Sequence, residues 1–293
     1  MKKGLIITVN ESQVFYEPER IREEAKKKGI DVDWWFYEDF ELEINQQGVL
    51  WKNRSRRCDF SQYRWAIVRS SVKDNGVNHA DLKVSLIRSL MATRVRVPNG
   101  KAFLEYLRFS KLVQHIRLAQ AKVPVVPSQF MCIFNPKSLK IPYPVIVKNT
   151  YGSQGKYVSK AASPTVLRQH VEQYNPSQSL LQQFLPTGED YRIIVIQGKA
   201  VGAMKRIAPH GQFISNISAG GFAQPVPLSS ELKKLSEKAA KLFHLDFCGV
   251  DIMCDPEGIP YVLEVNRHPQ FQGFEKATGI NVAEKLVTSV SGA

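Results

Sequence analysis

Two short apolar segments near the carboxyl end of the sequence carry oxygen-bearing side chains. The first runs from Gly249 to Cys254 and the second from Tyr261 to Asn266, with Gly258 in the turn between them. Apolar runs of this length on either side of a glycine turn predict two strands that pair as a β-hairpin. If the hairpin forms, it fixes which side chains of this part of the chain share one face of a sheet.

The hairpin predicts a site for a hard metal ion. Residues two apart on a strand face the same side, so Glu264 and Asn266 point together, and Asp251 joins them across the hairpin. Two carboxylates and an amide oxygen suit Mg²⁺, which proteins hold with few groups plus substrate phosphates, and Mn²⁺ is the alternative ion. A surface hairpin with solvated acids has the same pattern, because short motifs often occur by chance.

A second feature is a lysine that leaves an apolar strand and enters a glycine-rich loop. The strand runs from Tyr143 to Lys148, and the loop runs from Asn149 to Val158. Such a lysine reaches a phosphate as a point charge, and glycines let backbone N–H groups approach phosphates. The loop lacks the spacing of a P-loop or of a dinucleotide-binding turn. An ordinary hairpin turn is the alternative.

Taken in order, these segments resemble the ATP-grasp superfamily, and within it the RimK-type amino-acid ligases. The resemblance covers roughly residues 95 to 290. Any one segment is common, and the ordered set carries the resemblance. Besides the Lys148 strand and the Asp251 hairpin, the set comprises Leu181–Leu185, Glu189–Arg192, Lys205–Arg206, Phe213–Asn216, Gly220–Gly221 and Gly273–Gly279.

The resemblance implies an α/β and α+β architecture, the ATP-grasp fold with an N-terminal Rossmann-like lobe. We expect this first lobe at residues 1–98, a central ATP-grasp lobe with the glycine loop at 99–185, and a C-terminal lobe with the metal ligands at 186–293. In the family, ATP is clamped between the last two lobes. The rhythm of strand, helix and strand at the start of the chain also favours a small parallel sheet.

The expected elements follow from apolar periodicity, Gly and Pro punctuation, and helix caps. We expect strands at 4–9, 32–36, 65–69, 144–148, 156–160, 180–184, 191–196 and 200–206, and helices at 18–28, 79–93, 101–121, 164–174, 229–244 and 280–289.

The resemblance implies that Lys148 contacts nucleotide phosphate and that Lys111 is a second nucleotide-binding lysine. Lys111 lies in a basic segment, so a solvated charge is an equal alternative for it. The loop would lie over the phosphates through Gly152, Ser153, Gln154 and Gly155.

Adenine recognition is implied for Gln183, Phe184 and Leu185. RimK-type enzymes usually have Glu at the first of these positions, and the amide of Gln183 still donates and accepts hydrogen bonds. Asp190, or its neighbour Glu189, would meet the ribose or an adjacent positive group, and the other would be a surface acid.

The implied catalytic residues are Arg192, Arg206 and Asn216. Arg206 would place a guanidinium on the transferring phosphoryl group or the acyl-phosphate, where negative charge develops. Asn216 would help to position substrate or phosphate. The family's Arg-Ser-Asn is Ile214-Ser215-Asn216 here, so this arginine is missing and the contacts of the γ-phosphate are open.

These residues together imply an ATP- and Mg²⁺-dependent carboxylate–amine ligase that acts through an acyl-phosphate. The expected substrate is an amino acid, an acidic peptide or a carrier protein. Two alternatives stay open: a small-molecule kinase on the same fold, and a basic nucleic-acid- or protein-binding protein with a vestigial nucleotide site. The intact Lys148, Asp251, Glu264 and Asn266 argue against the last. The sequence names neither donor nor acceptor, and it allows a homo-oligomer.

The charge of +13 is unevenly spread. Residues 52–73 contain seven Lys and Arg against Asp59, and residues 82–122 contain nine against Glu105. A basic field attracts anions, so at least one substrate is expected to be acidic. A merely solubilising surface is the alternative.

Arg267 and His268 differ from the small residues common after the metal-binding Asn in RimK-type ligases. His268 is a candidate contact for a substrate carboxylate, although a packed or solvated histidine is the commoner outcome.

A cytoplasmic protein is expected, with no membrane partner. No apolar run approaches the roughly 20 residues of a membrane helix, and the first apolar run is too short for a signal peptide. The four cysteines show no ligand spacing, which favours free buried thiols in a reducing compartment.

Overall fold

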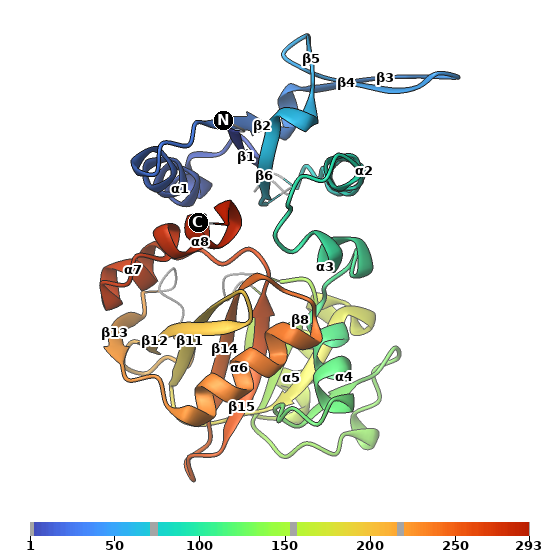
Figure 1. The fold of residues 1–293 in the computed structure, drawn as a ribbon. Coiled ribbons are helices and arrows are strands. Elements are labelled where there is room, and N and C mark those ends of the chain that lie inside the picture. The colour runs from blue at the N-terminus through green and yellow to red at the C-terminus, as the bar shows by residue number, and fades with distance from the viewer. Residues whose placement is uncertain (1–2, 71–75, 153–156, 216–219, 293) are drawn as a thin grey trace.

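The computed structural model describes residues 3–70, 76–152, 157–215 and 220–292 of the chain (Figure 1). Three sheets form its frame, one parallel and two antiparallel, and a separate antiparallel ribbon extends from the first. This is the mixed α/β and α+β architecture expected from the sequence.

The amino-terminal sheet is parallel, with strand order β2-β1-β6. It contains β1 (Lys3–Thr8), β2 (Val32–Phe36) and β6 (Tyr63–Val68), and helix α1 (Tyr16–Lys27) connects the first two. The expected strands and helix are confirmed, with small shifts at their ends. The expected parallel pairing follows, because a helical crossover returns the chain to the same edge.

An antiparallel ribbon that the sequence analysis did not predict extends from this lobe. It consists of β3 (Phe40–Asn45), β4 (Gly48–Asn53) and β5 (Arg56–Arg57), and it projects away from the body of the molecule in Figure 1. Phe40, Leu42 and Ile44 alternate with two glutamates, which is the two-residue period of a strand.

Three helices lead from the first lobe to the rest of the chain: α2 (Ala80–Ala92), α3 (Gly100–Glu105) and α4 (Lys111–Gln120). The expectation of one helix over 101–121 is wrong, because the helical path ends at Glu105 and begins again at Lys111. The Ser110 hydroxyl accepts a hydrogen bond from the Val113 N–H at 3.2 Å and caps the second helix.

The central sheet is antiparallel, with order β7-β10-β8-β9. Its strands are β7 (Ser128–Phe130), which was not expected, β8 (Val145–Asn149), β9 (Val158–Ala161) and β10 (Ser179–Gln183). Helix α5 (Pro164–Tyr174) packs against it with Leu167 and Val171. The expected start of this helix behind Ser163 is confirmed, and that serine caps it.

The carboxyl-terminal sheet is antiparallel, with order β13-β12-β11-β14-β15. Its strands are β11 (Glu189–Ile196), β12 (Lys199–Ile207), β13 (Phe222–Val226), β14 (Phe247–Cys254) and β15 (Pro260–Asn266). Both expected hairpins are confirmed, β11 with β12 and β14 with β15. Helix α6 (Ser230–Leu242) covers one face of the sheet (Figure 1).

Two further helices follow, α7 (Gln272–Thr278), which was not expected, and α8 (Val282–Ser291). Helix α8 lies between the amino-terminal lobe and the carboxyl-terminal sheet (Figure 1), and its Leu286 and Val287 share one buried core with Trp65 and Ile194. The first lobe is thus packed against the sheet through continuous apolar contact. Within the described parts of the chain, no helix combines the length and apolar character that crossing a bilayer requires.

Candidate active site

A cavity of about 790 Å³ lies where the central sheet, the carboxyl-terminal sheet and the amino-terminal lobe meet. It is lined by Lys111, Lys148, Gly152, Gln183, Phe184, Leu185, Asp190, Arg192, Arg206, Asp251, Glu264 and Asn266, among others. The fold therefore brings these predicted site residues together, although they are spread over more than half of the sequence.

Strand pairing aligns the charged side chains on one face of the carboxyl-terminal sheet. Arg192 on β11 is opposite Asp251 on β14, and Asp251 is opposite Glu264 on β15. Asp190 is opposite Arg206 on β12. Because strand residues alternate between faces, the neighbours of these residues point the other way, under α6, where Ile193 and other apolar side chains are buried.

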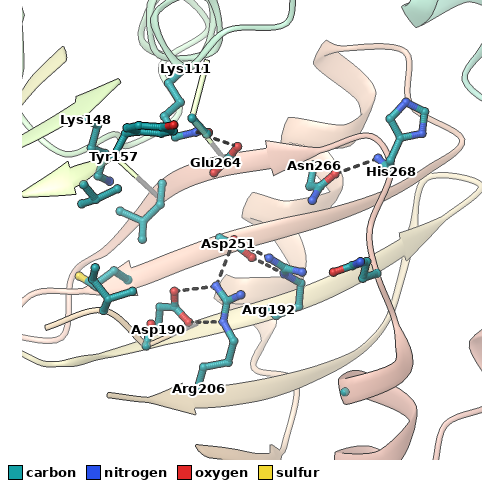
Figure 2. Close-up of a pocket in the computed structure, with 18 of the residues that line it drawn as sticks. Lys111, Lys148, Tyr157, Asp190, Arg192, Arg206, Asp251, Glu264, Asn266 and His268 are labelled. Atoms are coloured by element: carbon teal, nitrogen blue, oxygen red, sulfur yellow. Dashed lines mark hydrogen bonds and ion pairs between the residues drawn. The ribbon is translucent and has the colours of Figure 1, made fainter. Parts of the chain in front are cut away.

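Two arginines and two aspartates form a buried charge cluster on this face (Figure 2). Arg206 donates to both carboxylate oxygens of Asp190 at 2.6 Å, and its Nη2 lies 3.0 Å from Oδ2 of Asp251. Arg192 donates to both oxygens of Asp251, through Nη2 at 2.7 Å and through Nε. Paired guanidinium and carboxylate forks offset the large cost of burying four charges.

The two aspartates shift in opposite directions. Burial raises the pKa of Asp190 in spite of Arg206. Burial also opposes ionisation of Asp251, but the charges of Arg192 and Arg206 outweigh it and hold the pKa of Asp251 well below its usual range. Asp251 is therefore a permanent anion at the centre of the cluster.

Two lysines face this cluster from the other side of the cavity (Figure 2). Nζ of Lys111 donates to Oε1 of Glu264 at 3.2 Å and to the backbone oxygen of Gly152. Lys111 is only 8% exposed, so the alternative of a solvated charge does not hold for it. Burial, followed by repulsion from Lys111, lowers the pKa of Lys148 from 10.5 to about 8.

The donor set fits a hard cation by its chemistry. Asp251 and Glu264 are directly opposed across the hairpin, and Asn266 follows on the same face. In the described residues, no three carboxylate, imidazole or thiol groups gather at metal-binding distance, so a cation beside Asp251 and Glu264 would need another kind of oxygen ligand, such as the amide of Asn266. Oδ1 of Asn266 now accepts the His268 N–H at 2.8 Å.

An apolar slot continues the cavity beside Gln183, Phe184 and Leu185. The lining includes Val126 and Ile146, and the Gln183 N–H is held by the backbone oxygen of Pro127 at 3.0 Å. Lys160 lies 4.8 Å from the centre of the Phe184 ring. Apolar side chains with polar backbone atoms beside them have the chemistry of a site for a nucleobase.

Some predicted site residues do not line the cavity or lie outside the part of the chain that the structure describes. Glu189 pairs with Lys205 at 2.8 Å and does not line the cavity, so it is the surface acid of the Glu189–Asp190 pair. Ser153, Gln154, Gly155 and Asn216 lie outside the described residues.

His268 lines the cavity at the end away from Lys148 (Figure 2). Its ring stacks on Phe103 at 4.9 Å, and Nε2 lies 2.7 Å from Nζ of Lys83. Burial, with the charges of Lys83 and two arginines, moves the pKa of His268 well below its usual value, so the imidazole is neutral. The histidine is packed, and it also borders the cavity.

Three residues with which the amino-terminal lobe borders the cavity were not predicted from the sequence. Tyr16, Glu17 and Arg69 line it from this lobe. A signal for Arg69 was present, since it follows β6 directly, and ligands of parallel sheets bind beyond the carboxyl ends of strands.

Solved structures with this architecture define the class. The fold matches the ATP-grasp ligase PsnB bound to a minimal precursor, with a TM-score of 0.77 and 18% identity over 100% of this chain and 99% of that chain. It also matches PsnB bound to its minimal precursor, Mg and ADP, with a TM-score of 0.74 and 18% identity over 99% and 97% of the two chains. The chain has the ATP-grasp fold.

The family follows from the sequence match. The RimK-like ATP-grasp domain matches residues 87–290, and the chain belongs to this family. A relative from Thioalkalivibrio sulfidiphilus, named "Probable alpha-L-glutamate ligase", is 39% identical over 159 residues, which are 50% of each chain. The match thus spans about half the length of the curated relative. The resemblance to RimK-type ATP-grasp proteins is confirmed.

Proposed function

We propose that this chain is an ATP- and Mg²⁺-dependent carboxylate–amine ligase. The observation that carries the proposal is one cavity in which Lys111 and Lys148 face a row of paired charges, Arg192, Asp251 and Glu264, across two sheets. Such an array of fixed charges suits the positioning of phosphates and of the charge that develops on them. The family and the name of its relative support a ligase.

ATP would span the cavity from the apolar slot to the charge cluster. Its adenine would enter the slot beside Gln183 and Leu185, and its phosphates would meet Lys111 and Lys148. Lys148 contributes most when it is charged, and bound phosphate favours that form. Ser153, Gln154 and Gly155 are proposed to lie over the phosphates, as the resemblance implies.

Asp251, Glu264 and Asn266 would hold the metal ion. When bound, Mg²⁺ or Mn²⁺ would screen the negative charge of the phosphates and orient them. The carboxylate oxygens of Asp251 now meet Arg192 and Arg206, and those of Glu264 meet Lys111. Phosphate oxygens would therefore have to take over these cations as the carboxylates turn to the metal.

The reaction would proceed in two displacements. An oxygen of the donor carboxylate attacks the γ-phosphorus, the bond to ADP breaks, and an acyl-phosphate forms. The amine nitrogen then attacks the acyl carbon and loses a proton, and inorganic phosphate leaves. Arg206 and Arg192 would stabilise the charge on the transferring group, and Asn216 is proposed to assist. Because the activated acyl-phosphate forms on the substrate itself, no covalent enzyme intermediate is required.

The substrates are inferred more coarsely. The relative's printed name supports glutamate as one of them, and the basic stretches support an acidic partner.

We infer a reducing cytoplasmic setting from the four free cysteines. The expectation that these thiols are buried holds only for Cys248, since Cys132 is exposed and Cys58 and Cys254 are partly exposed.

A product assay tests the proposal. The protein is incubated with ATP and Mg²⁺ and a panel of amino acids, acidic peptides and mixtures of the two, and the products are analysed by mass spectrometry. We expect ADP and phosphate together with an adduct that has lost one water. An added phosphate on a hydroxyl would instead mark a kinase, and absence of turnover across the panel would contradict the ligase assignment.

A further inference from the structure

The cavity extends past the charge cluster to a second end that is built by the amino-terminal lobe. Arg69 and Glu17 line this end, together with His268 and Gln270. None of these residues belongs to the group that faces the nucleotide end. The second end therefore has room for a different part of the reaction, beyond the phosphates.

Arg69 is buried, and no carboxylate of the described residues lies within hydrogen-bond distance of its guanidinium. It is 4% exposed, and its Nη2 donates to the backbone oxygen of Pro269 at 3.1 Å. The nearest described carboxylate oxygen, Oε2 of Glu17, is 3.7 Å away. A guanidinium fork that is matched by a carboxylate lies at about 2.7–2.9 Å, so Glu17 does not saturate Arg69.

Glu17 is held in place by another contact. Its Oε1 accepts the backbone N–H of Phe271 at 2.9 Å, and its side chain is almost fully buried. This hydrogen bond keeps the carboxylate beside Arg69 without closing on it. Glu17 therefore acts as a positioning residue for the guanidinium.

Three basic side chains of the described residues gather around His268. Lys83 and Arg267 lie near this end, and both they and Arg69 act on His268. Among the described residues, Glu17 is the acid that acts on Arg69. Buried like charges repel at a cost that an anion arriving in the cavity would offset. Burial first, and then repulsion from Arg267 and Arg69, moves the pKa of Lys83 well below 10.5.

The place in the fold is one that suits a ligand. Arg69 directly follows β6 at the carboxyl end of a parallel sheet, where crevices of open α/β sheets bind small molecules. The backbone oxygen of Arg69 is also fixed, because the Tyr37 hydroxyl donates to it at 3.4 Å.

We propose that Arg69 binds a carboxylate of the amine-bearing substrate, and that this substrate is a free amino acid. The proposal rests on the ligase function. The donor carboxylate has to reach the γ-phosphate beside Arg206, so a carboxylate held by Arg69 is one that is not activated. A free amino acid presents such a carboxylate next to its attacking amine.

Binding measurements test this assignment without turnover. The protein is loaded with Mg²⁺ and a non-hydrolysable ATP analogue and titrated with the twenty amino acids by calorimetry. Each ligand that binds is then compared with its amides, for L-glutamate the α-amide and the γ-amide separately. We expect one amide to bind about tenfold to a hundredfold more weakly, because a charged hydrogen-bonded pair is lost.

The variant Arg69→Lys tests whether Arg69 causes the preference for the acid over its amide. It keeps the charge and replaces the fork by a point donor, so the preference for acid over amide should shrink to less than about one third of its wild-type value. Arg64→Lys, at an exposed position of the strand that Arg69 follows, is the matched control and should keep the full preference.

Two outcomes overturn the inference: an unchanged preference in Arg69→Lys, or no binding of any amino acid to the loaded wild type. The ligase proposal is judged separately, since it fails if the wild type binds no ATP analogue or yields no water-loss product. A protein that makes the product while Arg69→Lys binds like wild type contradicts this inference alone.

Discussion

Lys148 is the side chain whose role is simplest to isolate. It lies on β8 and lines the cavity, and its position suits contact with a phosphate. Lys148→Met should weaken ATP binding by about tenfold to a hundredfold, because one charge-assisted contact disappears. Calorimetric titration measures the ATP affinity, and circular dichroism checks that the variant is folded. Unchanged affinity would remove Lys148 from the nucleotide site.

The lowered pKa of Lys148 gives a pH dependence with a definite sign. In the free protein its pKa is about 8 rather than 10.5, and phosphate favours the charged form. Binding above that pH therefore takes up a proton, so ATP affinity should be nearly flat from pH 7 to 8 and then fall by up to about tenfold per unit.

Lys148→Arg is the control for this pH dependence, because arginine keeps its charge over the whole range. Its ATP affinity should stay level above pH 8. A wild-type affinity that is level up to pH 9.5 would show that Lys148 does not titrate in the way that its surroundings indicate.

Glu264 offers the cleanest test of the metal site. Its side chain is 34% exposed, and glutamine keeps an oxygen that can accept from Lys111, so Glu264→Gln should change the free energy of unfolding by less than about 1 kcal/mol. Mg²⁺-dependent ADP release should fall by about a hundredfold, while metal-free nucleotide binding persists. Full turnover in this variant would place the metal elsewhere.

Asp251 cannot serve the same purpose. Asp251→Asn would leave Arg192 and part of Arg206 buried without an anion, at a cost of about 3–5 kcal/mol. A loss of activity there would mix a lost ligand with lost stability.

Among the elements, strand β1 depends on a close approach that only glycine permits. Gly4 packs against the buried Trp65 on β6, and a Cβ at residue 4 would overlap the indole ring. Gly4→Ala should lower the free energy of unfolding by about 1–3 kcal/mol, because the ring or the strand has to move in a filled core. Urea denaturation measures the loss.

Lys3→Ala is the matched control for this strand. Its ammonium is 3.5 Å from Asp33 with much of the side chain exposed, so the change should be within about 0.5 kcal/mol. If Gly4→Ala is as stable as this control, the packing of β1 on Trp65 tolerates a methyl group.

Helices α3 and α4 show where periodicity was not enough. The apolar pattern from Lys101 to Ala121 is continuous enough for one helix, but Ser110 accepts from the Val113 N–H and begins a new one. This break matters for the site, because it places Lys111 in the first turn of α4, beside Gly152 and Glu264.

At the scale of the whole molecule, the surplus of positive charge predicts how an acidic substrate is captured. Charges screen each other beyond about 8 Å at physiological salt. The KM for that substrate should therefore rise with ionic strength, while turnover at saturation changes little. Arg94→Glu with Arg96→Glu should raise KM in the same way at low salt.

Lys28→Glu, an exposed change outside both basic stretches, is the control for charge alone. A KM that is independent of salt, together with a neutral substrate, would contradict the electrostatic role. Steady-state kinetics at several salt concentrations distinguish these results.

The sequence by itself determined the local geometry of this protein. The two-residue period of a strand put Glu264 and Asn266 on one face, and the glycine turn at Gly258 brought Asp251 opposite Glu264. Apolar periodicity, caps and turns likewise fixed most helices and strands, because these signals act between residues close in the chain.

Only the tertiary structure decided which charges meet. The pairing of β11 with β14 sets Arg192 against Asp251, and the docking of the first lobe brings Arg69 to the same cavity. No local pattern reports such contacts, because they join residues far apart in the chain. Burial lowers the pKa of Lys148, and Arg192 and Arg206 outweigh burial to lower the pKa of Asp251. Both effects exist only once the chain has packed.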